Sequence, residues 1–443
     1  MNGMTRRSFV SRAAAAAAFP TIIPASALGR GERPAPSERI TLGCIGGGGI
    51  DPNGNGNQGS RLMKSFMGRS DTQVVAVCDV DTRHRERLQG FAREHYAPAT
   101  RSGSFKGCDG YGDFREIIKR SDIDAVIIAL PDHWHATPVI MAANAGKDIY
   151  AEKPLSLTVA EGRAMVDAVE RNKVVFQTGS QLRAVPYMRR GCELVRNGRI
   201  GKLHTIRGVF HVAPSCPPQP EMPVPEGFDY DFWLGPAPEA PYTEKRCHFN
   251  FRWIWDYSGG QVTDHGAHYC DLAQWGKGSE RTGSVEVEGK GDFPTEGLFN
   301  VATAYHIEWT YADGVKLIGN EKGRDLVCVT FEGSEGWIHI GSELDAEPKS
   351  LLDSVIVPDE FHLPNINDHH GNFLDCIRSR ETPLAPIEEA HRSATICHIG
   401  NIAMKLGRKL RWDPEAEKFI GDPEANRMLS RPQREPWSLK AMT

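Results

Sequence analysis

The sequence between Asp124 and Pro154 reads as a strand, a turn, a helix and a second strand. The apolar run at residues 125–130 is typical of a strand buried on both faces. A helical pattern follows from about residue 137 and ends at Gly146, and a second strand is predicted at residues 148–151. Parallel strands joined through a helix are stable only in a sheet whose faces are covered by helices, so this stretch restricts the fold to the α/β class.

The same alternation extends on both sides of this stretch. Strands are predicted at residues 40–45, 74–78 and 174–177, and helices at 111–119, 158–172 and 187–196. This regularity predicts a doubly wound parallel sheet of the Rossmann type, in which ligands bind beyond the carboxyl ends of the strands. The ends of two neighbouring strands carry the ionisable residues Asp132, His133, His135, Glu152 and Lys153. We therefore expect an active site at this edge of the sheet.

Four glycines follow the first predicted strand. Gly46 and Gly48 fit the first two positions of a dinucleotide-binding fingerprint, but Asp51 occupies the third. We interpret Gly59, at the start of the next helix, as the third glycine after an inserted loop at residues 50–58. Asp79 follows the next strand and can accept hydrogen bonds from a ribose while repelling a 2′-phosphate, although it could instead cap a helix. The pattern favours NAD and leaves NADP open.

The pattern changes near residue 200. Strands are predicted at 203–212, 302–311, 315–318, 326–331 and 336–340, with tight turns typical of an antiparallel sheet, and helices follow at 365–378 and 386–406. A chain of 443 residues is also too long for one ordinary core. We predict a Rossmann domain at 38–155 and an α+β domain with a mostly antiparallel sheet at 156–410. The late helices should brace the two domains, and a polar tail occupies 411–443.

The amino terminus carries a targeting pattern. Arg6 and Arg7 form a twin-arginine pair, an alanine-rich stretch follows, and residues 25–27 provide a small-residue cleavage site. This predicts a signal peptide and linker at residues 1–37 and a periplasmic protein exported by the twin-arginine pathway. The mature part contains no apolar run long enough to span a membrane. The net charge of −5 gives no indication of a nucleic-acid partner.

A second group of candidate residues lies at 251–271. Asp264 and His268 share one face of a predicted helix, so the carboxylate could orient the imidazole and favour its protonated form. The alternative is a structural histidine at a buried helix. A metal site formed by His265, His268 and Asp271 is disfavoured, because neighbouring helical positions do not converge on one ion. We expect no metal.

These motifs resemble the Gfo/Idh/MocA family of nicotinamide-dependent oxidoreductases over nearly the whole mature chain. The resemblance is carried by the following residues: Pro131 with His135, Ala145-Gly146-Lys147 leading to Glu152-Lys153-Pro154, and Gly259-Gly260 followed by Asp264 and His268. It implies that the Rossmann domain is followed by an open-faced, mostly antiparallel sheet, that the bond before Pro154 is cis, and that a homo-oligomer forms through the open sheet. It further implies that Lys153 lies beside the nicotinamide and the substrate hydroxyl, that Asp264 orients the substrate, and that His268 is the acid/base. The predicted cofactor contacts are Gly46, Gly48, Gly59, Asp79, Pro131, His135, Glu152 and Lys153.

The expected reaction is oxidation of a secondary hydroxyl of a sugar, glycoside or polyol with tightly bound NAD. The candidate substrate contacts are Arg183, Arg252, Trp253, Asp256 and His265. Two alternatives remain open: a glycosidase, lyase or epimerase that passes through a transient keto sugar without net redox change, and a non-catalytic sugar-binding protein. Lys153 favours net oxidoreduction, and the presence of Lys153, Asp264 and His268 together argues against binding alone.

Overall fold

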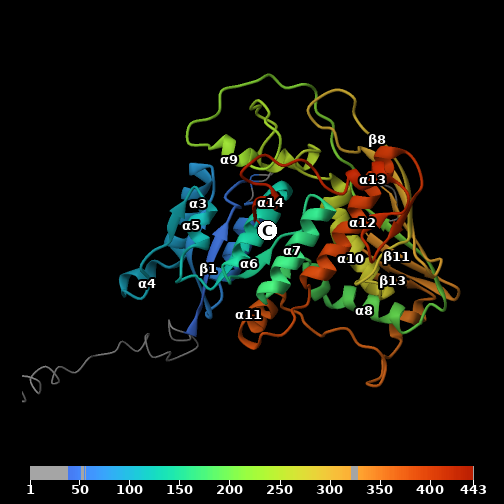
Figure 1. Ribbon diagram of the computed structural model, residues 1–443. Coiled ribbons are helices and arrows are strands. Elements are labelled where there is room, and N and C mark those ends of the chain that lie inside the picture. Colours follow the sequence, from blue (N-terminus) through green and yellow to red (C-terminus); the bar gives the residue numbers. More distant parts are fainter. Residues whose placement is uncertain (1–37, 51–53, 55, 321–327, 443) are drawn as a thin grey trace, which may run out of the picture.

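The computed structural model describes residues 38–50, 54, 56–320 and 328–442. The expected signal peptide at residues 1–37 and the twin-arginine pair within it therefore lie outside the described residues. Two β-sheets organise the rest of the chain, and they stand side by side in Figure 1 with helices packed around them.

The first sheet is parallel throughout and has the order β3-β2-β1-β4-β5-β6. Its strands are β1 (Ile40–Ile45), β2 (Thr72–Cys78), β3 (Asp109–Tyr111), β4 (Ala125–Ile128), β5 (Asp148–Ala151) and β6 (Phe176–Thr178). The predicted doubly wound parallel sheet is thus confirmed. The sequence places the domain boundary at residue 155, but β6 is still a strand of this sheet, so the sheet continues to residue 178.

Helices cover both faces of the parallel sheet (Figure 1). They are α2 (Gln58–Met67), α3 (Thr82–His95), α4 (Ala97–Arg101), α5 (Phe114–Ile118), α6 (Ala136–Asn144) and α7 (Val159–Asn172). The start of α7 is fixed by a capping box in which the side chains of Thr158 and Glu161 each accept a hydrogen bond from the other's backbone N–H. Every residue of β4 and β5 is buried, as the unbroken apolar pattern predicts.

The second sheet has the order β13-β12-β11-β7-β10-β9-β8-β14-β15. Its strands are β7 (Leu203–Val209), β8 (Glu286–Asp292), β9 (Ala304–Thr310), β10 (Lys316–Asn320), β11 (Cys328–Gly333), β12 (Gly336–Ile340), β13 (Leu344–Glu347), β14 (Leu410–Asp413) and β15 (Lys418–Phe419). Neighbouring strands pair antiparallel except β7 and β10, which are parallel. The prediction of a mostly antiparallel sheet is confirmed.

One face of the second sheet packs on α8 (Pro186–Arg196), α10 (Gln261–Lys277) and α12 (Ile387–Leu406). Alternate residues of β9, including Ile307 and Trp309, point into this core. The opposite face is polar and carries ion pairs between neighbouring strands, such as Lys316 with Glu308 at 2.6 Å. This is the open face expected from the sequence.

The last part of the chain joins the two domains. From α11 (His369–Ser379), Arg378 pairs with Asp71 at 2.7 Å, and the following Arg380 pairs with Asp148 at 2.7 Å. The region after residue 411, expected to be a polar tail, instead contributes β14 and β15 to the second sheet. After α13 (Pro423–Arg427), the chain returns to the first domain, where Trp437 packs 4.9 Å from the Trp134 ring before α14 (Leu439–Met442).

The connection from β7 to α10 crosses between the domains. It contains α9 (Tyr230–Leu234) and the 3₁₀ helix η5 (His248–Trp253), and Figure 1 shows it arching over the strand ends of the first domain. Its aromatic residues form a core of their own that also takes in Val80, at the end of β2. We call residues 213–257 the strap.

Candidate active site

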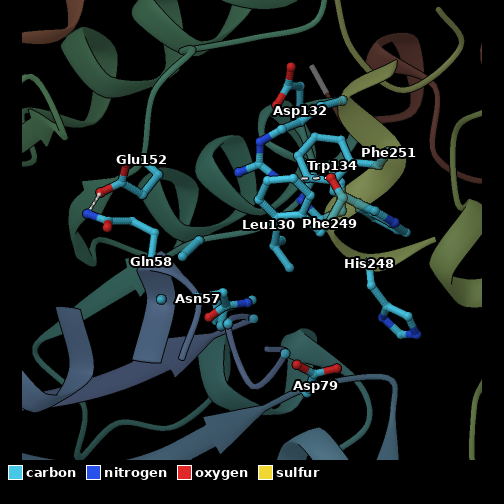
Figure 2. Close-up of a pocket in the computed structure, with 18 of the residues that line it drawn as sticks. Asn57, Gln58, Asp79, Leu130, Asp132, Trp134, Glu152, His248, Phe249 and Phe251 are labelled. Carbon is cyan, nitrogen blue, oxygen red and sulfur yellow. Dashed lines mark hydrogen bonds between the residues drawn. The ribbon is translucent and has the colours of Figure 1, made fainter. Parts of the chain in front are cut away.

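A cavity of about 480 Å³ lies where the carboxyl ends of β1, β2, β4 and β5 meet α10 and the strap. Both domains line it, and Figure 2 shows the residues that project into it. This is the edge of a parallel sheet at which ligands bind, and the position agrees with the sequence analysis.

The glycine loop after β1 forms one wall. Gly46, Gly47 and Gly49 line the cavity. Gly47 has a φ of +98°, which favours glycine. It also packs closely on Gly59, since a Cβ added to Gly47 would lie 2.5 Å from the Gly59 Cα. Gly48, the predicted close-approach glycine, instead backs onto α3, where an added Cβ would lie 2.4 Å from the carbonyl oxygen of His84. The second loop position at the cavity is therefore Gly47.

The insertion predicted before Gly59 leaves the helix start intact. The Asn57 side chain caps α2 by accepting a hydrogen bond from Ser60 N at 3.3 Å, and Gly59 lies in the first turn. Residues 51–53 and 55 of the insertion lie outside the described residues. Bare loop backbone beside the amino terminus of a ten-residue helix fits the pyrophosphate of a dinucleotide, because the helix dipole favours negative charge there.

Asp79 lies at the cavity beyond the glycine loop. Its carboxylate accepts hydrogen bonds from Gly48 N at 3.1 Å and Asp81 N at 3.0 Å. These bonds fix the carboxylate where a ribose would lie, and the capping role falls to Asp81, whose side chain accepts from Arg83 N. The capping role that the sequence left open for Asp79 therefore belongs to Asp81, and the ribose contact of Asp79 stays a prediction.

Asp81, His84 and His248 place one potential metal-binding atom each within 4.8 Å of one another, the one such group among the described residues. His84 argues against an ion. Burial would lower its pKa, but hydrogen bonding to Asp79 and the charges of Asp79 and Asp81 outweigh burial and raise it. The two carboxylates thus favour the protonated form of His84, which would have to lose that proton before binding a metal, and we assign no metal role to this group.

The ends of β4 and β5 supply Pro131, Glu152 and Lys153 to the cavity, and the Lys153–Pro154 bond is cis. The Glu152 carboxylate accepts hydrogen bonds from the side-chain amides of Gln58 at 3.1 Å (Figure 2) and Gln181 at 3.0 Å. His135, predicted to contact the cofactor, is 1% exposed and does not line the cavity. Its ring nitrogens lie 2.6 Å from the Pro154 carbonyl oxygen and 2.9 Å from that of Leu130, so it supports the two strand-end turns from behind.

Lys153 and Asp264 form the charged centre of the site. The Lys153 Nζ donates to Asp264 Oδ1 at 2.6 Å and to the Asp264 carbonyl oxygen at 2.9 Å, and Arg252 Nε donates to Asp264 Oδ2 at 3.1 Å. Burial alone would raise the pKa of Asp264, but the charges of Lys153 and Arg252 outweigh burial and hold it well below its usual range. Asp264 therefore remains a carboxylate that fixes both cations.

His268 lies one turn further along α10 and lines the same cavity. Burial, reinforced by the charge of Lys153, lowers its pKa well below the usual value, and its Nδ1 atom is buried without a hydrogen-bond partner. The sequence predicts that Asp264 favours protonated His268. The structure differs, because Asp264 holds Lys153 and Arg252, and His268 is a neutral imidazole able to accept a proton.

The candidate substrate contacts divide into two groups. Arg252, Trp253 and His265 line the cavity, and burial lowers the pKa of His265 to about 4. Asp256 is not among the lining residues. Arg183 is also elsewhere: it is 1% exposed and pairs with Asp271 at 2.6 Å and with Glu389 at 2.5 Å. The prediction of a substrate contact at Arg183 is wrong, since its charge is fully used within the second domain.

Asp132 is a cavity residue to which the sequence analysis gives no role. It follows Pro131 in the 3₁₀ helix η3 (Asp132–Trp134), is 4% exposed, and accepts a hydrogen bond from Ser258 Oγ at 2.6 Å. Burial raises the pKa of this carboxyl to about 7, with a further contribution from the negative charge of Asp264. The position of Asp132 after a strand end is visible in the sequence, but its partner Ser258 is 126 residues away.

Replacing Asp132 with asparagine should stabilise the protein at pH 8 and change little at pH 4. A carboxyl whose pKa is raised on folding binds more protons in the native than in the unfolded chain, so stability falls as pH rises from about 4 through 7. The Asp132→Asn side chain does not titrate and avoids this loss, and the expected gain at pH 8 is about 1–4 kcal/mol. Thermal unfolding midpoints at both pH values measure it, with Asp167→Asn at the surface as control. Equal changes at both pH values would contradict the argument.

The structure is that of a two-domain protein in which a glycine loop at the edge of a parallel sheet faces a charged cluster across one cavity. Residues 43–180 match the family model described as "Oxidoreductase family, NAD-binding Rossmann fold", and residues 217–439 match "Oxidoreductase family, C-terminal alpha/beta domain". The protein belongs to the Gfo/Idh/MocA oxidoreductase family and carries its NAD-binding domain.

Curated relatives and solved structures agree with this assignment. The chain is 27% identical to the rhizopine catabolism protein MocA of Rhizobium meliloti over 68% of this chain and 71% of that protein. It is 40% identical to levoglucosan dehydrogenase of Pseudarthrobacter phenanthrenivorans, but over 22% of this chain and 25% of the relative. The structure of GenD2 from gentamicin A biosynthesis, solved in complex with NAD, superposes with a TM-score of 0.59 at 18% identity, covering 85% of this chain and 97% of that one. At that identity the likeness concerns the fold alone. Among the described residues, no helix has both the length and the apolar character needed to cross a membrane.

Proposed function

We propose that this protein oxidises a secondary hydroxyl group of a sugar, glycoside or polyol and uses tightly bound NAD. The observation that carries the proposal is the Lys153–Asp264 pair, joined at 2.6 Å, beside neutral His268 in the cavity that the glycine loop lines. The family membership and the match to levoglucosan dehydrogenase support a carbohydrate substrate. Asp79 favours NAD over NADP, because its carboxylate would repel a 2′-phosphate.

The residues of the chain account for the proton and the charge. When bound, NAD supplies the acceptor for the hydride that leaves the carbinol carbon. The imidazole of His268 accepts the hydroxyl proton, and the Lys153 ammonium group stabilises negative charge that develops on the hydroxyl oxygen. Asp264 holds that ammonium group in place with Arg252 on its other oxygen. The aromatic side chains of Phe249, Phe251 and Trp253 give the cavity the apolar surfaces on which sugar rings stack.

The proposal extends to location and assembly. The twin-arginine pattern around Arg6 and Arg7 supports export in the folded state. Because free NAD is scarce outside the cytoplasm, an exported enzyme would have to carry its cofactor with it. The open polar face of the second sheet is the surface through which we propose that the chain forms a homo-oligomer.

The absorbance spectrum of the purified protein tests this function. On addition of a panel of glycosides without free NAD, a reduced-nicotinamide band should appear and persist until a second carbonyl compound is added. Glycoside breakdown without a lasting band would replace the proposal with an internal redox cycle of a glycosidase or lyase. No spectral change with any sugar, in protein that contains NAD, would favour a binding protein.

A further inference from the structure

The strap is attached to the first domain at two places that flank the cavity. At the end of β2, Thr82 N donates to the Gly227 carbonyl oxygen at 2.8 Å and Asp229 N donates to that of Val80 at 3.1 Å, so that Phe228 pairs with Asp81 like a short added strand. At the end of β4, Trp134 Nε1 donates to the Trp233 carbonyl oxygen at 2.9 Å. These hydrogen bonds therefore hold the strap against the first domain.

The strap also presents aromatic rings to the cavity. Phe228 and His248 both line it, and their ring centroids are 5.3 Å apart. The ring of His84, from α3 of the first domain, lies 4.8 Å from that of His248. His248 has a φ of +56°, a left-handed conformation that is costly for a residue with a side chain. The strained backbone conformation at His248 therefore places its ring at the cavity.

The order of groups in a dinucleotide indicates what these rings contact. The glycine loop and the start of α2 fit the pyrophosphate, and Asp79 fits the adenosine ribose. The next group outward is the adenine base, which must lie on the far side of Asp79 from the glycine loop. Three rings follow Asp79 in series: His84, whose Nδ1 lies 3.6 Å from Asp79 Oδ1, then His248, then Phe228. All three line the cavity, and Figure 2 shows Asp79 and His248 toward the same end of it, away from Glu152.

We propose that the strap completes the adenosine site, with the adenine ring held against His248 and Phe228 of the second domain and His84 of the first. This inference rests on the proposed use of NAD. Aromatic rings bind a base through its face, and burial of the base between two domains adds a barrier to its release. Because the strap is bonded to the first domain at residues 227–229 and at Trp233, it should slow the release of NAD from this end.

The variant His248→Asn tests the proposal. Asparagine tolerates the left-handed backbone better than most residues, so the strap should keep its path while the ring is lost. The affinity of the NAD-free protein for ADP-ribose should fall about 5- to 150-fold, as expected for loss of one stacking partner of a base. The affinity for nicotinamide mononucleotide should stay unchanged. Calorimetry measures both, and release of bound NADH, followed by its fluorescence, should be faster in the variant.

The matched control is His204→Asn, which removes an exposed imidazole from β7 outside the cavity and should leave both affinities unchanged. Thermal unfolding midpoints within a few degrees of the parent protein establish that the variants are folded. ADP-ribose affinity equal in the parent and in His248→Asn would overturn the proposal. Failure of the parent protein to bind either NAD or ADP-ribose would instead contradict the proposed function, so the two failures are distinguishable.

Discussion

Replacing His268 with alanine should lower kcat by about 10²- to 10⁴-fold, the range typical of a lost general acid/base. His268 is the one neutral imidazole that lies beside the Lys153–Asp264 pair on α10 with a buried, unpartnered ring nitrogen among the described residues. In the proposed reaction, its loss removes the group that accepts the hydroxyl proton. The prediction is checked by single-turnover reduction of bound NAD on addition of a substrate glycoside.

The variant should still contain NAD, since the predicted contacts of the pyrophosphate and the adenosine lie elsewhere. His306→Ala, which removes an exposed histidine from β9, serves as control and should react at the parent rate. A His268→Ala enzyme that turns over within a few-fold of the parent would remove His268 from the mechanism and make His265, whose lowered pKa leaves a neutral imidazole at the cavity, the next proton acceptor to test.

Replacing Arg183 with leucine should destabilise the protein by about 3–5 kcal/mol, the usual cost of removing one partner of a buried ion pair. Arg183 donates to Asp271 from two guanidinium nitrogens, at 2.8 and 2.6 Å, and to Glu389 at 2.5 Å. It thereby joins α10 and α12 through a side chain that is 1% exposed. Leucine fills the space but leaves the buried Asp271 carboxylate without a cation, whereas Glu389 keeps Arg281 at 3.4 Å. Urea unfolding measures the loss.

The control for Arg183 is Arg207→Leu on the open face of the second sheet. Arg207 pairs with Glu332 at 2.8 Å, but its side chain is 48% exposed, so its loss should cost about 0–1 kcal/mol. If the two variants unfold at the same urea concentration, the Arg183 network contributes no more than a surface pair. Reduced substrate affinity in a fully stable Arg183→Leu protein would restore the role in substrate binding that the sequence suggests.

The sequence is most informative where function follows from local position. The residues at the ends of β4 and β5 can be assigned to one site because parallel strands end at a common edge. Asp264 and His268 can be placed on one helical face by their spacing. The inserted loop before Gly59 does not hide the dinucleotide cradle, because the helix start and the acidic residue after β2 keep their order.

The predictions that the structure corrects concern residues whose interaction partners are distant in the sequence. Arg183 and Arg252 are alike as residues, and only the folded chain brings Asp271 and Glu389 to the first and Asp264 to the second. The helical spacing pairs Asp264 with His268, whereas its closest cation is Lys153, 111 residues away. The strap carries no local signal for its place at β2, since its pairing with residues 80–82 joins segments about 145 residues apart.

Both sheets have short edge strands. The outermost strands are β3 and β6 in the first sheet and β13 and β15 in the second, with lengths of three, three, four and two residues. An edge strand offers unpaired backbone groups to any other extended chain, and short edges offer few. The longest strands lie inside the sheets with both sides paired. The architecture should therefore resist edge-to-edge aggregation, even though the described residues form fifteen strands.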